Sequence, residues 1–467
     1  MVDRPPGPQS VLDLVGRTPV VPLRKVAKGV PYRILVKLEF LNPGGSVKDR
    51  IGAAMIDDAE RKQLLRPGGT IVEATSGNTG VGLAMVAAVR GYRCIFVLND
   101  KMSSEKIRLL KAYGARVIVT PSQLPPDHPQ SNYSVAKRLS ETLPGAYYPN
   151  QYANSLNPEA HYRTTGPEID RDGGPDLAAV VGTVGTGGTM SGIGRYFKEH
   201  RPRVRVVAVD PAGSILGPYF RTRELSVATP YQVEGIGEDM IPKTIHFQYL
   251  DEFVEVHDGE SFALARRLAR EEGLFVGGSS GAAVAGALRW LERRPIPEGS
   301  TVVIVLPDSG DRYLSKFYSD DWMREKGFLG RPATARDLAT RKRSTPALVA
   351  VDPTTLVRDA LAQLRHYGIS AAPVLSGDQN MGSVWEDDLL RRTLEDETLM
   401  ERTVTSALQP AFGEVPAEDP VPDLLHRLKE EPILLVRDSA TGLPIGVLTR
   451  HDLVAHLSDE AEVTDAI

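Results

Sequence analysis

The stretch TIVEATSGNTGVGLAMVAAVRG, residues 70–91, passes from a short apolar run through a loop of threonine, serine and glycine into a helical pattern. The run at 70–74 does not alternate polar and apolar side chains, as is typical of a parallel strand covered on both faces. The same order of strand, loop and helix recurs along the chain, with further apolar runs at 94–98, 116–120, 177–184, 204–210 and 301–306. This alternation predicts an α/β fold of parallel sheets flanked by helices, with ligands bound at the carboxyl ends of the strands.

Length and composition narrow the class of protein. A chain of 467 residues exceeds the usual size of a single core, so we expect two or three domains. The net charge of −5 gives no reason to expect a nucleic acid or an anionic membrane as partner. Cys94 is the only cysteine, which excludes an intrachain disulfide and favours a reducing, cytoplasmic setting. Residues 1–10 lack the apolar core of a signal peptide, and no apolar run approaches the roughly 18 residues of a membrane span.

The alternation of apolar strands and helices ends near residue 330. Residues 335–395 and 402–458 each pass through helices and short strands to a last helix with acidic residues near its start, and together they form a weak internal repeat. We therefore predict an α/β domain over residues 1–330, followed by two copies of one small α+β unit.

Three glycine loops lead from strands into helices, at 73–80 (EATSGNTG), 181–192 (VGTVGTGGTMSG) and 274–284 (LFVGGSSGAAV). The second loop suits a phosphate, because consecutive backbone N–H groups form a nest, hydroxyls add hydrogen bonds and the helix dipole favours negative charge. It does not complete the dinucleotide pattern G-x-G-x-x-G, since Met190 occupies the place of the third glycine. The first loop taken alone is equally compatible with an ordinary helix cap.

Lys48 follows a glycine turn in NPGGSVKDRIG, residues 42–52, at the expected start of a helix. By itself it could be a solvated charge in a first turn or a lysine used for chemistry. One lysine near a turn, a phosphate cradle and two further polar glycine loops together suit pyridoxal 5′-phosphate, which needs an amine for its aldehyde and a nest for its phosphate.

Six motifs then occur in the order of one enzyme family. They are GRTPVVPL (16–23), PGGSVKDR (43–50), TSGNTG (75–80), GTGGT (185–189), VEGIGED (233–239) and GGSSG (277–281). With them, residues 8–329 resemble the fold-type II pyridoxal-phosphate family that contains cystathionine β-synthases and O-acetylserine sulfhydrylases. The resemblance implies two three-layer subdomains, each built on a parallel sheet, and pyridoxal 5′-phosphate as cofactor.

The resemblance also assigns roles to residues. It implies that Lys48 binds the aldehyde of the cofactor and carries the α-proton of the substrate, and that Asn78 hydrogen-bonds the ring hydroxyl. The phosphate is expected at Gly185, Thr186, Gly187, Gly188 and Thr189. The substrate carboxylate is expected at Thr75, Ser76, Thr79 and Gln151, with Gly235 and Tyr152 beside the second substrate.

By the same resemblance, Ser279 faces the pyridine nitrogen. A hydroxyl leaves that nitrogen essentially uncharged, whereas a carboxylate would keep it protonated. The weaker electron sink favours expulsion of a β-substituent, and hence β-replacement chemistry.

Finer features separate the branches of this family. Tyr152 in NQYANSLNP, the insert at 121–148, acidic Glu238 and Asp239 and the paired tail all resemble the synthase branch. That branch condenses L-serine with L-homocysteine to cystathionine and water, in the pathway of transsulfuration. The alternatives are the sulfhydrylase reaction of O-acetylserine with sulfide, release of hydrogen sulfide from cysteine, and a ligand sensor whose catalytic half is vestigial.

The tail resembles a Bateman module, a pair of CBS units, in HYGISAAPVL (366–375) and GVLTRHDL (446–453). Thr449 and Asp452 match the hydroxyl and carboxylate that contact a ribose in nucleoside-binding modules. In the first repeat Trp385 replaces the hydroxyl residue while Asp388 remains. We expect at most one adenosyl ligand, near Thr449 and Asp452, with a ligand-free structural module as the alternative.

The sequence indicates neither a heme nor a metal ion. Neither Cys nor His precedes Cys94, so the heme of animal synthases is not expected. The nine histidines show no paired ligand spacing, which argues against a metal site, and His161 is interpreted as a packing residue. By resemblance, the protein is expected to form a homodimer or homotetramer.

Overall fold

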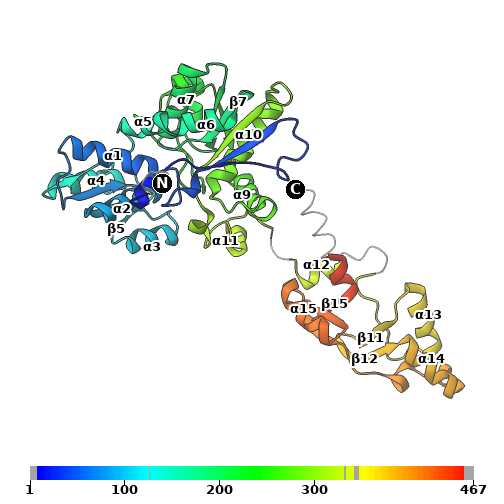
Figure 1. Ribbon diagram of the computed structural model, residues 1–467. Helices are drawn as coiled ribbons and strands as arrows, with labels where there is room; N and C mark the ends of the chain where they lie inside the picture. The colour runs from blue at the N-terminus through cyan, green and yellow to red at the C-terminus, as the bar shows by residue number, and fades with distance from the viewer. Residues whose placement is uncertain (1–7, 126, 331–332, 341–345, 457–467) are drawn as a thin grey trace, which may run out of the picture. The chain divides into compact units, whose positions relative to one another are not determined.

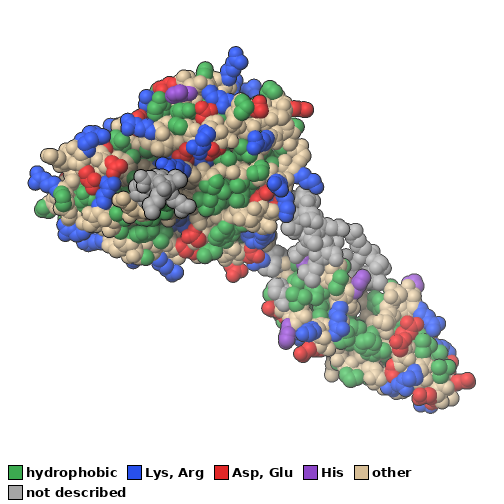
Figure 2. All heavy atoms as spheres, in the orientation of Figure 1, with side chains coloured by type: hydrophobic (Ala, Val, Ile, Leu, Met, Phe, Trp, Pro, Cys, Tyr) green, Lys and Arg blue, Asp and Glu red, His purple; other side chains and the backbone are tan. Residues whose placement is uncertain are grey.

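The computed structural model describes residues 8–125, 127–330, 333–340 and 346–456. The chain separates into two compact units, Met1–Leu329 and Gly330–Ile467 (Figure 1). Among the described residues, none of the helices combines the length and the apolar character that crossing a membrane would require. Figure 2 shows basic and acidic side chains interspersed over the visible face of the N-terminal unit, as the balanced charge predicts.

The N-terminal unit contains two sheets. The smaller has the order β5-β4-β3-β6 and is parallel throughout, and the larger has the order β1-β2-β10-β7-β8-β9, in which only β1 is antiparallel. The strands are β1 (Val20–Pro22), β2 (Arg33–Leu38), β3 (Thr70–Ala74), β4 (Arg93–Asn99), β5 (Arg116–Thr120), β6 (Ala146–Tyr147), β7 (Leu177–Thr183), β8 (Arg205–Pro211), β9 (Glu252–Val256) and β10 (Thr301–Leu306). The helices are α1 (Asp49–Arg61), α2 (Asn78–Arg90), α3 (Ser104–Ala112), α4 (Asn132–Thr142), α5 (Leu156–Arg163), α6 (Thr165–Gly173), α7 (Gly188–His200), α8 (Leu216–Thr222), α9 (Asp258–Glu272), α10 (Gly278–Arg293) and α11 (Asp320–Glu325).

Helices cover both faces of the larger sheet. Along β10, Val302 and Ile304 pack in the core that contains α9 and α10, whereas Val303 and Val305 pack in the core that contains α6 and α7. This alternation makes every residue of β10 buried, and it explains why the strand reads as a continuous apolar run.

The smaller sheet is built in the same way. Ile71 packs with side chains of α1 and α2, while its neighbour Val72 packs on the opposite face with Ala136 of α4. In Figure 1 helices α1 to α4, blue to cyan, gather around this sheet. The fold-type II architecture of two three-layer subdomains is therefore confirmed. One strand differs from expectation: β5 is an edge strand, and Val119 in it is 49% exposed because no neighbour covers that position.

Two glycines bring α1 against α2. A β-carbon at Gly52 would lie 2.7 Å from the carbonyl carbon of Gly82, and one at Gly82 would lie 2.8 Å from the carbonyl oxygen of Lys48. Such distances leave room only for glycine, so the backbones of the two helices touch. The contact places Lys48, directly before α1, beside the first turn of α2.

The C-terminal unit contains a two-stranded sheet, β11-β12, and a three-stranded sheet, β13-β14-β15. Its elements are α12 (Ala335–Thr340), α13 (Val357–Tyr367), β11 (Ala371–Ser376), β12 (Gln379–Trp385), α14 (Glu386–Glu395), β13 (Gly413–Pro416), α15 (Val421–Glu430), β14 (Ile433–Arg437) and β15 (Pro444–Thr449). In both halves a helix is followed by an antiparallel strand pair. A small core that includes Leu375, Phe412 and Leu435 joins them.

A chain that ends at Leu329 is expected to fold alone, because it keeps every strand of both large sheets and their cores. Its thermal unfolding, followed by circular dichroism, should be one cooperative transition. A control chain that ends at Arg294 lacks β10, which lies between β2 and β7, and should not unfold cooperatively. If the chain that ends at Leu329 also lost cooperative unfolding, the N-terminal unit would not be an independent folding unit.

Candidate active site

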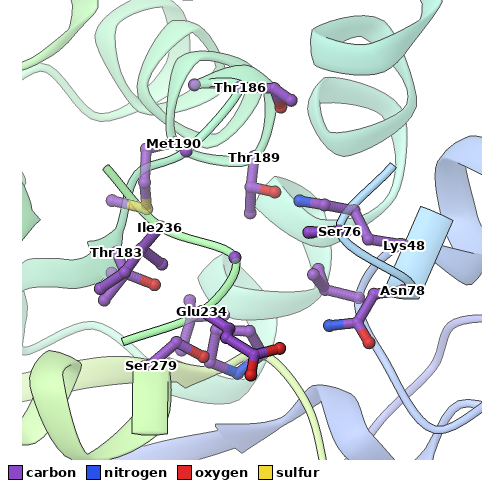
Figure 3. Close-up of a pocket in the computed structure, with 17 residues that line it drawn as sticks. Lys48, Ser76, Asn78, Thr183, Thr186, Thr189, Met190, Glu234, Ile236 and Ser279 are labelled. Atoms are coloured by element: carbon purple, nitrogen blue, oxygen red, sulfur yellow. The ribbon is translucent and has the colours of Figure 1, made fainter. Parts of the chain in front are cut away.

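One pocket lies where the carboxyl ends of β3, β7 and β10 meet the loops that follow them (Figure 3). It is lined by Val47, Lys48, Ser76, Asn78, Gly182, Thr183, Gly185, Thr186, Gly187, Thr189, Met190, Glu234, Gly235, Ile236, Ser279, Val305 and Pro307. Most of the residues expected at the cofactor and its substrates thus surround a single space, although they come from five separate parts of the sequence. Thr75, Gly188, Thr79, Gln151 and Tyr152 do not line it.

Lys48 is the basic side chain of this pocket. In Figure 3 it points across the pocket toward Thr189. Burial lowers the pKa of Lys48 to about 8, although the carboxylates of Asp308 and Glu238 favour its charged form. An amine with this pKa is a better proton acceptor and nucleophile near neutral pH than an ordinary lysine.

Asp308 joins three of the pocket's segments and was not anticipated from the sequence. Its carboxylate accepts hydrogen bonds from Asn78 Nδ2 at 2.8 Å, from the Tyr313 hydroxyl at 2.6 Å and from the Ser279 hydroxyl at 3.4 Å. Arg312 donates to the side-chain oxygen of Asn78. The amide of Asn78 is therefore held in one orientation. The position of Asp308 directly after the end of β10 was the available signal, because the carboxyl ends of parallel strands meet at the site.

The loop between β7 and α7 has the form of an anion cradle. Gly187 has φ of +78°, a conformation that glycine adopts without strain, and a β-carbon there would lie 2.4 Å from that of Ile245. The first N–H groups of α7 lack partners within the helix, and Thr186 and Thr189 add hydroxyls. Gly188 lies behind the cradle, where a β-carbon would overlap the amide of Asn157.

The residues expected to hold a substrate carboxylate divide into two groups. Ser76 lines the pocket, whereas Thr75 is buried and its hydroxyl oxygen accepts the N–H groups of Gly77 and Gly80 at 3.0 and 3.2 Å. The Thr79 hydroxyl donates to Gln151 Oε1 at 2.6 Å. The buried hydroxyls of Thr75 and Thr79 shape the loop around Ser76.

Gly235 lines the pocket, whereas Tyr152 packs against another tyrosine. Gly235 has φ of +81° and lines the pocket, with only the Ser76 hydroxyl oxygen within 4 Å of a β-carbon built on it. The ring of Tyr152 contacts that of Tyr133 edge to face, 5.1 Å between centroids. Burial and the nearby Glu238 carboxylate raise the pKa of Tyr152, so its hydroxyl stays neutral.

A buried ion pair fixes the loop that carries Gly235. Glu234 pairs with Lys106 at 2.8 Å and with Lys316 at 2.7 Å, and the carboxylate and the Lys106 ammonium are almost completely buried. These two lysines were not anticipated from the sequence, because their charge partner is more than 80 residues away.

In the C-terminal unit, a hollow of about 590 Å³ lies between the two repeats, lined among others by Trp385 and Asp388 of the first and by Phe412 of the second. Asp388 accepts from Gln409 and pairs with Arg391 and Arg392. At the second repeat, the Thr449 hydroxyl donates to the Asp452 carboxylate at 2.8 Å. No group of three or more metal-ligating side chains gathers within the described ranges.

Two family models match the chain. One, described as pyridoxal-phosphate dependent enzyme, matches residues 11–308, and the other, described as CBS domain, matches residues 335–394.

Relatives of this chain include cystathionine beta-synthases. The chain is 41% identical over 434 residues to the cystathionine beta-synthase of Mus musculus, across 91% of this chain and 77% of the mouse protein. It is 40% identical over 411 residues to that of Saccharomyces cerevisiae, across 82% and 81% of the two chains.

Similar solved structures carry two further names. One is O-ureido-L-serine synthase, with a TM-score of 0.62 and 40% identity, covering 68% of this chain and all of that one. Another is an O-acetylserine dependent cystathionine beta-synthase from Helicobacter pylori, with a TM-score of 0.61 and 40% identity, covering 66% and 98%.

The lowered pKa of Lys48 gives a prediction for the protein without cofactor. Competitive labelling with acetic anhydride, read by mass spectrometry at a series of pH values, should give Lys48 a midpoint near pH 8. Asp308→Asn should move this midpoint lower, because a carboxylate that favours the charged amine is removed. A midpoint near the reference value of 10.5 would contradict the buried environment.

Proposed function

The chain belongs to the family of pyridoxal-phosphate-dependent enzymes, and on that basis we propose that it is a cystathionine β-synthase, which condenses L-serine with L-homocysteine to give L-cystathionine and water. The observation that carries the proposal is the buried Lys48, with its lowered pKa, opposite an anion cradle, in a chain whose relatives include cystathionine beta-synthases.

The pocket residues fit pyridoxal 5′-phosphate. An amine stands at one end, two glycines and two threonine hydroxyls stand at the cradle, and the Asn78 amide and Ser279 hydroxyl would face a bound ring. When bound, this cofactor withdraws electrons from the substrate α-carbon, which makes the α-proton acidic and a β-substituent easy to expel. Asp308 holds Asn78 and Ser279 in place for that ring.

Lys48 would move the proton. A neutral amine at Nζ can accept the α-proton of serine, and the resulting ammonium can return it after the thiol has added at the β-carbon. The carboxylates of Asp308 and Glu238 favour the ammonium, so the pKa of Lys48 remains near 8 and both directions of transfer stay accessible near neutral pH.

An amino-acid thiol is favoured over sulfide as second substrate by polar side chains beside the pocket. Glu238 lies close enough to interact with both Lys48 and Lys101, and the Lys101 ammonium lies 4.0 Å from the ring centre of Tyr231. A carboxyl group and an amine can form hydrogen bonds with the two charged groups of homocysteine, whereas sulfide has no such groups. The second candidate is an enzyme that takes O-acetylserine as first substrate, which the name of the Helicobacter pylori structure brings forward.

Steady-state kinetics test this assignment. Serine with homocysteine should give cystathionine with a higher kcat/KM than O-acetylserine with sulfide. Lys48→Ala should lower turnover with either pair by several orders of magnitude, because both a covalent anchor and a proton carrier are lost. A higher kcat/KM for O-acetylserine with sulfide would place this enzyme in the sulfhydrylase branch.

For the tail we propose one regulatory adenosyl ligand, at Thr449 and Asp452. A ligand bound there alters catalysis only if it binds two arrangements of the protein with different affinity. Of the two repeats, the second keeps the hydroxyl and carboxylate side by side.

Titration calorimetry with S-adenosylmethionine tests the tail. The full-length protein should bind at most one ligand per chain, and Asp452→Ala should remove most of the affinity because a ribose would lose its acceptor. Asp388→Ala, at the matching place in the first repeat, is the control and should leave binding unchanged. Two equivalent sites, or binding indifferent to Asp452→Ala, would contradict this proposal.

A further inference from the structure

Helix α5 presents two polar side chains to the back of the anion cradle. Asn157 and His161 are four residues apart, so they lie on the same face of the helix, and both are completely buried. Close packing leaves little freedom here, since a β-carbon at Gly192 of α7 would lie 2.2 Å from the carbonyl oxygen of Pro158. Each of the two side chains contacts one threonine hydroxyl of the cradle.

Asn157 sets the direction of the first of these hydrogen bonds. Its Nδ2 lies 2.8 Å from the carbonyl oxygen of Gln151 and 3.0 Å from Thr186 Oγ1. A carbonyl oxygen can only accept, so the atom facing it must be the N–H₂ group. The second N–H then points at Thr186, whose oxygen accepts and whose own hydrogen is left for another partner.

His161 stands behind the second threonine. Its Nε2 lies 3.2 Å from Thr189 Oγ1, and its Nδ1 lies 2.9 Å from Thr165 Oγ1. Burial, together with the positive charges of Lys48 and Arg50, lowers the pKa of His161 well below its usual range, so the ring is neutral. A neutral ring has one N–H and one lone pair, and two tautomers are therefore available.

The two tautomers differ in what they present to the pocket. With the hydrogen on Nδ1, the Thr189 hydroxyl would donate to Nε2, and an anion would face only its lone pairs. With the hydrogen on Nε2, the ring donates to Thr189 Oγ1, the Thr165 hydroxyl donates to Nδ1, and the Thr189 hydrogen is free to point outward. In Figure 3 the hydroxyl oxygen of Thr189 faces the pocket, toward the tip of Lys48.

We propose that His161 is a positioning residue for the cofactor phosphate: held by Thr165, its Nε2–H turns the hydroxyl hydrogen of Thr189 toward the phosphate. Asn157 acts in the same way on Thr186. The phosphate of a monoester is largely dianionic at neutral pH and needs donors, so its binding selects this tautomer. This inference rests on the proposed function only in that the protein binds pyridoxal 5′-phosphate, and it changes the interpretation of His161 as a packing residue.

Binding of the cofactor with and without its phosphate distinguishes this role of His161 from a packing role. Full-length protein freed of cofactor would be titrated with pyridoxal 5′-phosphate and with pyridoxal, which lacks the phosphate. His161→Leu should raise the Kd for pyridoxal 5′-phosphate roughly tenfold to a hundredfold, as expected for a hydrogen bond to a charged group. The Kd for pyridoxal should change less than about twofold, and His161→Gln, which keeps an amide N–H, should recover part of the loss.

A second pair of variants serves if His161 variants do not fold. Thr165→Val removes the donor to Nδ1 and should raise the Kd for pyridoxal 5′-phosphate several-fold, by roughly the worth of a neutral hydrogen bond. Thr164→Val is the matched control, because the Thr164 hydroxyl donates to the carbonyl oxygen of Ala160 at 2.7 Å and does not touch the ring. In the wild-type holoenzyme, ¹⁵N NMR of the ring should show the hydrogen on Nε2.

Equal weakening of both cofactor forms in the His161 and Thr165 variants, or a hydrogen on Nδ1 in the holoenzyme, would overturn the inference. Failure of the proposed function would look different. A wild-type protein that binds pyridoxal 5′-phosphate but prefers another substrate pair leaves this inference standing, because its test measures binding and tautomer alone.

Discussion

The carboxylate of Asp308 is the group on which the geometry of the active site depends. It is buried at the end of β10, the strand next to β2 and β7 in the larger sheet, and it accepts hydrogen bonds from Asn78, Ser279 and Tyr313. Asn78 begins α2, which packs on the smaller sheet, so this carboxylate links the two halves of the catalytic unit. A buried carboxylate is costly unless it is fully hydrogen-bonded, and the three donors offset that cost.

A second buried network stands directly behind Lys48. Arg50, two residues later in α1, donates to Glu39 and Glu168 at 2.7 to 2.8 Å, and Lys37 pairs with Glu168 at 2.8 Å. The hydrogen bonds and charges of Arg50 and Lys37 outweigh burial and lower the pKa of Glu168 to about 2. Removing one partner would leave an unpaired buried charge, so this network fixes the start of α1 rather than adding much net stability.

Burial acts on the titrating groups of the site in opposite directions. It lowers the pKa of Lys48 and His161, and it raises that of Glu238 and Tyr152, so that burial shifts each equilibrium toward the uncharged form. Near neutral pH, Lys48 with a pKa of about 8 therefore keeps an accessible neutral form, and behind the anion cradle His161 is a neutral imidazole. The anion cradle supplies its donors mainly from backbone N–H groups and hydroxyls, which need no ionised side chain close to the phosphate.

The sequence by itself determined the strand–loop–helix order, the three-layer fold and the lysine and glycine loops of the site, because apolar runs, glycine turns and motif spacing are local properties of the chain. It missed Asp308, Lys106 and Lys316, and it foresaw neither the hydrogen bonds of His161 with Thr165 and Thr189 nor that β5 is an exposed edge. Those features depend on contacts between residues far apart in sequence, such as Asn78 with Asp308 or Glu234 with Lys106. A charge or an imidazole has the same letter whether it is solvated or buried. Only the tertiary structure decided which hydrogen bonds each group makes, and with them its protonation state and its role.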